Sequence, residues 1–453
     1  MLLILLLLKK LRFNVKLLST PLLILAFNAS GQTSKVTLAE DQGSWKLMVD
    51  GNPYYINGAG GSSELEELKQ IGGNTIRTWS VENAQEILDE AQKNGLKVMM
   101  GLWVQHERHG FDYDNEARVK SQLETFRRSV KKFKDHPALL IWCIGNEYEL
   151  NYTNPKVWGA VNDIARMIHQ EDPNHPTATV TAGTNDEKLS FVMTELTEID
   201  IYGINTYGDI GNVHNVIERG NYKGPYMITE WGPTGHWEIM KTMWGTSIEQ
   251  TSTEKATTYR ERYQKYIGAY SQQCIGSFAF LWGHKQEYTS TWYGLFTEDG
   301  KPTEAVDELQ YSWTGSYPAN RAPSIDSVLF SGKDQILDLV LEPGSKQTVQ
   351  LFASDKNKDP LNYNWELYPE STDLKTGGDT EGKPPIISGR IKGRTSNEIV
   401  LRTPMQEGRY RLFVFIDDGS KVAYMNIPFY VEATTGEISK TQLKKQKLEP
   451  FEY

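Results

Sequence analysis

The stretch ALLIWCIGNE, residues 138–147, is almost entirely apolar until it stops at Asn146 and Glu147. An unbroken apolar run of this length is typical of a β-strand buried on both faces, as in parallel sheets and α/β barrels. In such folds the catalytic groups project from the carboxyl ends of the strands. Taken alone, the stretch also fits a core strand followed by an ordinary solvated glutamate at the start of a helix.

A second stretch, PYMITEWG at residues 225–232, repeats the pattern and ends in a carboxylate, Glu230. Trp231 follows it, and then the chain-breaking pair Gly232-Pro233. Cleavage of a glycosidic bond needs two carboxyl groups, one as proton donor to the leaving oxygen and one as nucleophile or base. Two strands that each end in Glu therefore favour Glu147 and Glu230 as a catalytic pair.

From residue 45 onward the chain alternates between strand and helix patterns. Strands are predicted at 54–59, 74–79, 97–104, 138–145, 177–182, 199–207, 225–230 and 275–282, and helices at 63–71, 82–94, 115–133, 156–170, 187–197, 214–219, 253–273 and 303–311. Such strict alternation over roughly 260 residues predicts an α/β fold, a closed (β/α)₈ TIM barrel. A doubly wound open sheet is the alternative, but it seldom needs eight repeats.

Polar and aromatic side chains follow most of these strands. They are Arg77, His106, Asn146, Glu147, Asn205, Tyr207, Glu230 and Trp282. Any one of them alone would more often be a surface or hydrogen-bonding residue. Together they fall on the face where barrel enzymes place their chemistry, which predicts a shared site. The long connections 232–252 and 283–302 are expected to form its walls.

These motifs resemble the glycoside hydrolases of clan A, in particular the family 2 type of TIM-barrel catalytic domain. The resemblance covers about residues 45–313 and is carried by GNE at 145–147, TEWG at 229–232, DGNPYYINGAGG at 50–61, Arg77, Tyr207 and Trp282. It implies a retaining mechanism with Glu147 as acid/base and Glu230 as nucleophile. It also implies that Asn146 holds the sugar 2-hydroxyl, that Arg77 and Tyr207 orient the nucleophile, and that Trp282 forms a platform under the sugar. His106, Asn205 and Trp231 are expected to contact substrate as well.

The chain departs from family 2 enzymes before the barrel. Residues 35–49 have room only for a short β-hairpin, where those enzymes carry β-sandwich domains. The order of signal, barrel and β domain is similar to clan A endo-β-glucanases and β-glucanosyltransferases, and to the bacterial family 158 endo-β-1,3-glucanases. This layout implies a β-glucan rather than a galactoside or a glucuronide.

The net charge and composition of the chain indicate which classes of molecule it binds. The formal net charge of -10 argues against a polyanionic partner such as nucleic acid. Few basic residues lie near the strand ends, whereas aromatic residues such as Trp103 and Trp237 are frequent there, and flat sugar faces stack on such rings. We therefore expect a neutral oligo- or polysaccharide as substrate, no metal or other cofactor, and a monomer.

The ends of the chain predict export and a second folded region. Basic residues before the apolar run 17–27 indicate a signal peptide at 1–31, hence a secreted, periplasmic or cell-surface protein. After the catalytic domain at 35–313 we expect a linker at 314–323, an Ig-like or PKD-like β-sandwich at 324–432 and a flexible tail at 433–453. The linker leaves from the last helix, so the sandwich is expected to be a support or spacer away from the active site.

The segment 353–366 of the expected sandwich carries Asp355, Asn357 and Asp359. Oxygen ligands in alternating positions could bind Ca²⁺, but a solvated turn is the more common explanation of such a segment.

Three functions remain open at this stage. The first is a secreted retaining O-glycosidase that hydrolyses β-glycosidic bonds of a neutral glycan, such as a β-glucan, by double displacement. The second is a β-glucanosyltransferase on the same scaffold, in which a sugar rather than water attacks the glycosyl-enzyme. The third is a glycan-binding protein without catalysis. The presence of both Glu147 and Glu230 favours an enzyme.

Overall fold

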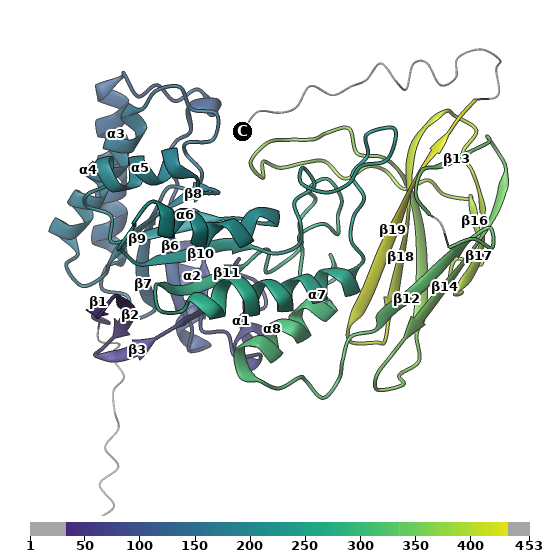
Figure 1. Ribbon diagram of the computed structural model, residues 1–453, viewed down its shortest axis with the longest axis horizontal. Helices are drawn as coiled ribbons and strands as arrows, with labels where there is room; N and C mark the ends of the chain where they lie inside the picture. Colours follow the sequence, from purple (N-terminus) through teal and green to yellow (C-terminus); the bar gives the residue numbers. More distant parts are fainter. Residues whose placement is uncertain (1–32, 335, 434–453) are drawn as a thin grey trace, which may run out of the picture.

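The computed structural model describes residues 33–334 and 336–433. Eight of its strands form one parallel sheet: β4 (Ile56–Gly60), β5 (Thr75–Arg77), β6 (Lys97–Leu102), β7 (Leu139–Ile144), β8 (Thr177–Ala182), β9 (Ile201–Asn205), β10 (Tyr226–Trp231) and β11 (Cys274–Ala279). They close into a barrel in the order β10-β11-β4-β5-β6-β7-β8-β9 (Figure 1). The prediction of a (β/α)₈ barrel is confirmed.

Helices connect the strands and surround the barrel. They are α1 (Leu65–Gln70), α2 (Ala84–Lys93), α3 (Glu116–Phe133), α4 (Lys156–Glu171), α5 (Asp186–Glu195), α6 (Val213–Arg219), α7 (Ser252–Arg262) and α8 (Glu304–Thr314). One helix was expected over 253–273, but α7 ends at Arg262 and is followed by a π-helical turn at Tyr263–Ile267 and a 3-10 helical turn at Gly268–Tyr270. Over residues 33–334 and 336–433, no helix is both long and apolar enough to cross a membrane.

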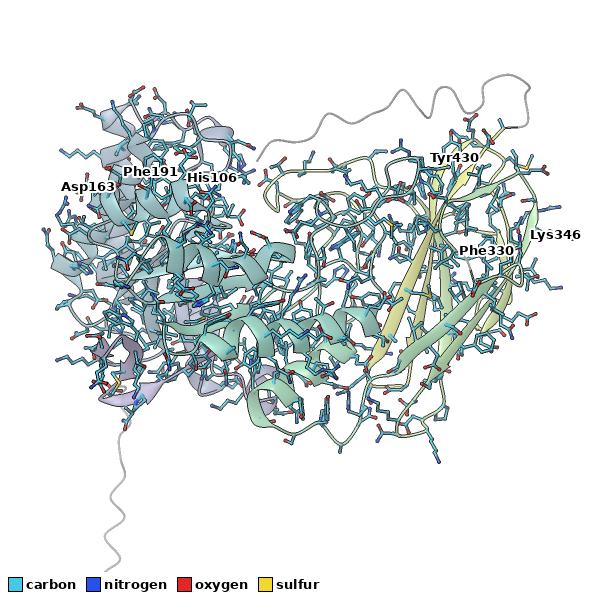
Figure 2. All side chains as sticks on the ribbon, in the orientation of Figure 1. His106, Asp163, Phe191, Phe330, Lys346 and Tyr430 are labelled. Carbon is cyan, nitrogen blue, oxygen red and sulfur yellow. The ribbon has the colours of Figure 1, made fainter. Side chains whose placement is uncertain are left out.

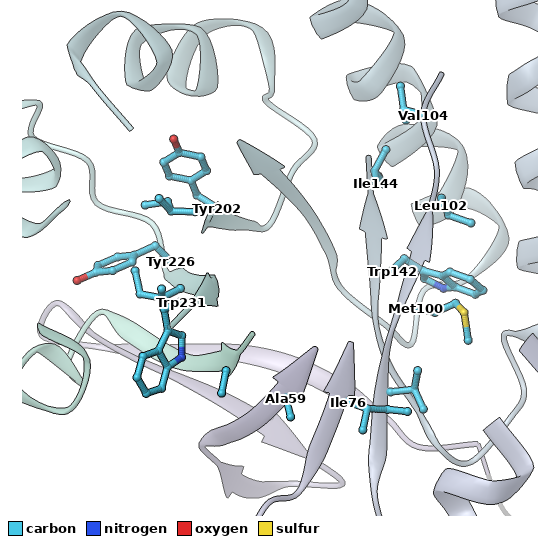
Figure 3. Close-up of a cluster of buried hydrophobic side chains, with 14 of the residues drawn as sticks. Ala59, Ile76, Met100, Leu102, Val104, Trp142, Ile144, Tyr202, Tyr226 and Trp231 are labelled. Carbon is cyan, nitrogen blue, oxygen red and sulfur yellow. The ribbon is translucent and has the colours of Figure 1, made fainter. Parts of the chain in front are cut away.

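The barrel strands separate two apolar layers. In β7, Ile141 and Cys143 belong to the cluster inside the barrel, whereas Trp142 and Ile144 belong to the cluster between strands and helices. Figure 3 shows part of this outer layer, including Trp142 and Trp231. Successive side chains of a strand point to opposite faces. A strand buried on both faces must therefore be apolar throughout, as residues 138–144 are.

A small antiparallel sheet closes the amino end of the barrel. It consists of β1 (Val36–Asp41), β2 (Ser44–Val49) and β3 (Asn52–Tyr54). The fully buried Leu47 packs with Ile56 against the inner cluster. This sheet corresponds to the short hairpin expected at 35–49. The predicted signal peptide lies outside the described residues.

The C-terminal region forms two four-stranded sheets. One has the order β12-β14-β17-β16 and the other β13-β19-β18-β15. The strands are β12 (Ser324–Phe330), β13 (Leu339–Leu341), β14 (Lys346–Ser354), β15 (Asn362–Pro369), β16 (Ile391–Lys392), β17 (Glu398–Arg402), β18 (Gly408–Asp417) and β19 (Val422–Val431). Both sheets contribute to one buried cluster around Trp365. An all-β region is confirmed, whereas its Ig-like character stays a prediction, and the tail beyond residue 433 lies outside the described residues.

The C-terminal region is held closely against the barrel. In the expected linker, Arg321 donates from Nε to Asp307 in α8 at 3.1 Å and lies 3.7 Å from the centre of the Tyr317 ring. The backbone N–H of Ile325 donates to Thr253 Oγ1 at 2.9 Å, and that of Tyr424 donates to Ser252 Oγ at 2.9 Å. These contacts tie the linker to α8 and both sheets to α7.

The predicted calcium ligands are only partly brought together. Asp355 and Asp359 lie with Asp418, and one carboxylate oxygen of each is within 4.8 Å of the others. Asn357 has a different role, because its side chain accepts from Arg321 N at 2.8 Å and donates to Ala319 O at 2.7 Å. The structure thus uses Asn357 to hold the linker.

Candidate active site

The predicted site residues meet at the carboxyl end of the barrel. Arg77 ends β5, Asn205 ends β9 and Glu230 lies in β10, while Asn146 and Glu147 follow β7 directly. Parallel strands bring their carboxyl ends to one edge, which is why residues far apart in sequence converge here. The hydrogen bonds below join these side chains into one network.

The turn after β7 aims Glu147 at the mouth of the barrel. Gly145 has φ +74°, and a Cβ added to it would lie 2.6 Å from the Tyr148 ring. Glu147 itself has φ +50°, and its N–H donates to Val180 O at 3.0 Å. A left-handed residue other than glycine is unfavourable by about 1 kcal/mol or more, and such residues concentrate at functional sites.

The Glu230 carboxylate is held by three donors. Arg77 Nη1 and Trp79 Nε1 each donate to Oε1 at 2.9 Å, and Tyr207 OH donates to Oε2 at 3.1 Å. Arg77 is fully buried, so its charge is poorly screened by water. These contacts fix the orientation of Glu230 and place a full positive charge beside it.

Glu147 has a different environment. Among the described residues, Asn205 is the one side chain that donates to it, from Nδ2 to Oε1 at 2.7 Å. Burial raises the pKa of Glu147 to about 7, and the negative charge of Glu230 acts in the same direction. At neutral pH, Glu147 is therefore protonated in a large fraction of molecules.

Arg77, Asn146 and Asn205 link the two carboxyl groups. Arg77 Nη2 donates to Asn146 Oδ1 at 2.6 Å, and Asn205 Nδ2 also donates to that oxygen at 3.0 Å. Asn205 Oδ1 accepts from Thr229 Oγ1 at 2.9 Å, which orients its amide toward Glu147. The structure thus brings together Arg77, Asn146, Glu147, Asn205, Tyr207 and Glu230.

His106 lies at the side of this network, beside the backbone of Asn146. Figure 2 labels it on the part of the barrel that faces the C-terminal region. Its ring stacks between Trp103 and His109, with centroids 4.7 and 5.3 Å away. Burial, together with the charge of Arg108, lowers the pKa of His106 to about 4. His106 is therefore neutral at physiological pH.

Two predicted sugar contacts are wrong. Trp231 is 0% exposed and packs on Tyr259 in the layer between strands and helices. Because Glu230 faces the mouth, its neighbour in the strand must face the other way, so the alternation of β10 could have excluded Trp231. Trp282 is 1% exposed, packs on Phe296 and donates from Nε1 to Glu64 O at 3.2 Å. It cannot act as an open platform.

Other aromatic residues surround the carboxylates instead. Trp79, two residues beyond Arg77, donates to Glu230 and packs edge-on against Phe280 at 5.9 Å. Tyr207 contacts Phe280 at 6.1 Å and Trp237 at 5.7 Å. Trp79 and Phe280 were not predicted, although both follow barrel strands closely, which is the signal that could have found them. Trp237 lies in the connection 232–252 that was expected to form a wall.

The C-terminal region also reaches the mouth, which corrects the expectation of a spacer away from it. Residues 370–390 between β15 and β16, here called the crossing loop, extend from the sheets back toward the barrel (Figure 1). Asp379 accepts from Arg108 Nη1, after β6, at 3.0 Å. The linker does leave from α8, as expected. The crossing loop nevertheless extends from the C-terminal sheets to the mouth of the barrel, and no local sequence pattern predicts its contact with Arg108.

Comparisons with known proteins agree with the barrel and its motifs. Residues 62–316, more than half of the chain, match the family described as "Glycosyl hydrolases family 2, TIM barrel domain". A beta-galactosidase of Leuconostoc mesenteroides subsp. mesenteroides is 21% identical over 401 residues, which cover 87% of this chain and 35% of that protein. An exo-beta-D-glucosaminidase of Arthroderma benhamiae is 22% identical over 129 residues, or 24% of this chain and 15% of that protein.

Solved structures are similar at low sequence identity. A putative beta-galactosidase from Bacteroides fragilis has a TM-score of 0.48 and 16% identity, over 88% of this chain and 58% of that chain. A beta-glucuronidase of Bacteroides uniformis has a TM-score of 0.49 and 14% identity, over 88% of this chain and 48% of that chain. The chain spans about a third or less of the length of the curated relatives named above. Since the family match extends over most of the barrel that carries Glu147 and Glu230, the chain belongs to the TIM barrel domain family of the family 2 glycosyl hydrolases.

Proposed function

We propose that the protein is a retaining glycoside hydrolase that cleaves β-glycosidic bonds. The observation that carries this proposal is the contrast between two carboxyl groups in one network. Glu230 lies against Arg77, whereas the pKa of Glu147 is raised to about 7. A retaining glycosidase needs one ionised and one protonated carboxyl group.

In the first step, Glu230 attacks the anomeric carbon while Glu147 donates its proton to the leaving oxygen. The bond between the sugar and the leaving group breaks as the ester bond to Glu230 forms. The negative charge of Glu230 is lost in that ester, which removes one cause of the raised pKa of Glu147. Glu147 can then take a proton from the water that releases the sugar, with net retention.

We further propose a neutral glycan as the substrate. Three cations at the mouth of the barrel are each paired with a carboxylate: Arg77 with Glu230, Lys285 with Glu287 and Arg108 with Asp379. A sugar carboxylate would therefore have to compete with an existing ion pair. The β-glucan expected from the layout is neutral, as is the galactoside implied by the name of one relative.

Export and assembly also remain proposals. The basic and apolar pattern of residues 1–31 supports a secreted, periplasmic or cell-surface protein. The two C-terminal sheets support an Ig-like or PKD-like sandwich. We propose a monomer, which light scattering of the purified protein would test.

The direct test is hydrolysis of 4-nitrophenyl β-glucoside, β-galactoside and β-glucuronide, followed by NMR of the first sugar released. We expect turnover of a neutral glycoside and a product of β configuration. Release of the α anomer would exclude retention and the assigned role of Glu230. Oligosaccharide products longer than the substrate would show that a sugar acceptor, rather than water, completes the reaction.

The variant Glu147→Ala tests whether Glu147, rather than Glu230, is the acid/base. Without the acid, we expect kcat/KM, which reports formation of the glycosyl-enzyme, to fall about 10²- to 10⁴-fold on substrates with poor leaving groups and far less on 4-nitrophenyl glycosides. Azide should restore turnover and yield a β-glycosyl azide, because it attacks the glycosyl-enzyme without needing a base. Glu261→Ala, which removes a surface partner of Lys265, is the matched control. Equal losses on both substrate types would contradict the assignment.

A further inference from the structure

Trp237, in the connection between β10 and α7, is the most exposed tryptophan among the described residues. It is 38% exposed, whereas Trp231 and Trp282 are buried. A lone exposed apolar side chain is common on protein surfaces, so exposure by itself says nothing about function. The position of Trp237 and the way its ring is held are what distinguish it.

The ring of Trp237 is fixed from behind. It lies on the backbone of Gly235, where an added Cβ would be 2.7 Å from the indole carbons. It also stands nearly perpendicular to the rings of His236 and Tyr207, with centroids 4.9 and 5.7 Å away. Because edge-to-face contacts of this kind are favourable, they hold the ring in one orientation while part of its surface stays open to solvent.

Hydrogen bonds also hold the turn that carries Trp237. The side chain of Glu238 accepts from the N–H of Gly208 at 2.7 Å, which ties the turn to the connection after β9. The same carboxylate accepts from the N–H of Gly235 at 3.0 Å. The ring is therefore pre-organised, and a ligand that stacks on it would not have to order it first.

The crossing loop does not cover Trp237. Its hydrogen bonds to the barrel, such as that from Lys285 Nζ to Gly378 O at 2.7 Å, go to the connections after β6 and β11. Trp237 lies in the connection after β10 and is tied to the one after β9. The exposure of its ring is that of the folded chain with the crossing loop in place, so a ligand at the mouth can reach it.

Trp237 lies one aromatic ring away from the nucleophile. Tyr207, against which it packs, donates from its hydroxyl to Glu230 Oε2 at 3.1 Å. Trp79 contacts the same carboxylate directly, through a hydrogen bond from its Nε1. Since Tyr207 separates Trp237 from Glu230, a sugar that rests on Trp237 is a neighbour of the sugar that Glu230 attacks.

The groups around Trp237 favour a neutral ligand. The carboxylate of Glu238 is already occupied by backbone N–H groups. Burial, together with the charge of Lys241, lowers the pKa of His236 to about 4, so that this ring is neutral at physiological pH. A pyranose with equatorial hydroxyls has flat faces of C–H groups, which pack on an aromatic ring while the hydroxyls stay hydrated.

We propose, on the basis of the glycosidase function proposed above, that Trp237 is the platform of a second sugar subsite: the exposed face of its ring stacks on the unit of a neutral β-linked oligosaccharide that adjoins the unit attacked by Glu230. The protein therefore recognises at least two consecutive sugars of its substrate.

Kinetics with substrates of different length test this subsite. The probes are 4-nitrophenyl β-glucoside and β-galactoside, and tetrasaccharides of β-1,3-linked glucose, β-1,4-linked glucose and β-1,4-linked galactose. Trp237→Ala should lower kcat/KM about tenfold on the tetrasaccharide that the wild type cleaves, because one stacking contact is lost, and far less on the 4-nitrophenyl glycoside. Trp237→Phe, which keeps a flat ring, should recover most of the loss.

Phe352→Ala is the matched control, because Phe352 is an aromatic residue of almost the same exposure, 39%, and lies in β14 of the C-terminal sheets. It should leave kcat/KM unchanged on every probe. Equal losses for Trp237→Ala on both kinds of substrate would show that the ring only supports Tyr207, and would overturn the inference. An unchanged kcat/KM, or a wild type that cleaves a 4-nitrophenyl glycoside but none of the tetrasaccharides, would overturn it as well.

A second measurement does not depend on turnover. In the Glu230→Gln background, isothermal titration calorimetry gives the Kd of each tetrasaccharide without cleavage. Adding Trp237→Ala should raise the Kd about tenfold, and adding Phe352→Ala should not change it. An unchanged Kd with Trp237→Ala, or binding of no tetrasaccharide, would overturn the subsite. Binding that depends on Trp237 in a wild type without turnover of any probe would instead overturn the proposed function alone.

Discussion

Glu249 and Glu147 are two carboxylates of the same barrel in opposite surroundings. Glu249 lies where the barrel meets the C-terminal sheets and accepts from Lys255 Nζ at 2.5 Å, Asn426 Nδ2 at 2.6 Å and two threonine hydroxyls. Burial opposes its ionisation, but the positive charges of Lys255 and Arg411 hold the pKa of Glu249 below its usual range. Glu147 has one side-chain donor, and its pKa is raised.

The difference shows that burial alone does not set the state of a carboxyl group. Where donors and cations fully compensate the charge, as around Glu249, the group holds two parts of the molecule together. Where compensation is incomplete and a second carboxylate is close, as around Glu147, the group keeps a proton that it can give to a substrate. The following predictions test this contrast, from the largest expected effect to the smallest.

Glu230→Gln should lower kcat about 10⁴-fold or more on every substrate, because an amide cannot form the glycosyl-enzyme. The measurement is the turnover of 4-nitrophenyl glycosides, with circular dichroism to confirm that the variant is folded. Azide should not restore hydrolysis with retention, in contrast to Glu147→Ala. A folded variant that retained a tenth of the activity would exclude Glu230 as the nucleophile.

Glu249→Ala should destabilise the fold by about 3 to 5 kcal/mol, because Lys255 is left charged and buried. Urea unfolding followed by fluorescence measures this, and kcat of the folded fraction should change less than twofold. Glu261→Ala, which removes an exposed partner of Lys265, should leave the urea midpoint unchanged. Similar urea midpoints for both variants would show that Glu249 does not stabilise the buried charge of Lys255.

Glu147→Gln should make the protein more stable at alkaline pH. The pKa of Glu147 is raised above the ordinary value of 4.5, so the folded state binds more protons than the unfolded state between pH 4.5 and about 7. Wild-type stability should fall across that window, and the variant, which cannot ionise there, should exceed it by roughly 1 to 3 kcal/mol at pH 8. Near pH 4 the gain should vanish. A constant difference at all pH values would contradict the raised pKa.

Asn205→Ala should move the alkaline limb of the pH profile of kcat/KM upward. The limb should lie near pH 7 in the wild type, because Glu147 must be protonated to act as the acid. The amide of Asn205 donates to Glu147 and favours its charged form, so its removal raises the pKa of Glu147 further. The limb position is independent of any loss in absolute rate. A downward shift would be incompatible with the donor role of Asn205.

The barrel could be predicted because its signals are local. Apolar runs such as 138–144 show that strands are buried on both faces, and their alternation with helical patterns leaves few folds other than a closed barrel. Glu147 and Glu230 could be singled out because each is the polar residue at the end of such a strand.

Several of the residues that surround Glu147 and Glu230 could not be predicted from the sequence, because only the tertiary structure brings them together. The aromatic residues of the mouth are Trp79 and Phe280 rather than Trp231 and Trp282, because backbone direction after each strand decides which ring faces the carboxylates. The contact between Arg108 and Asp379 joins residues 271 positions apart. Secondary structure is encoded over a few residues and can be read from the chain, whereas contacts between distant loops depend on how all the elements pack, and no short stretch of sequence records them.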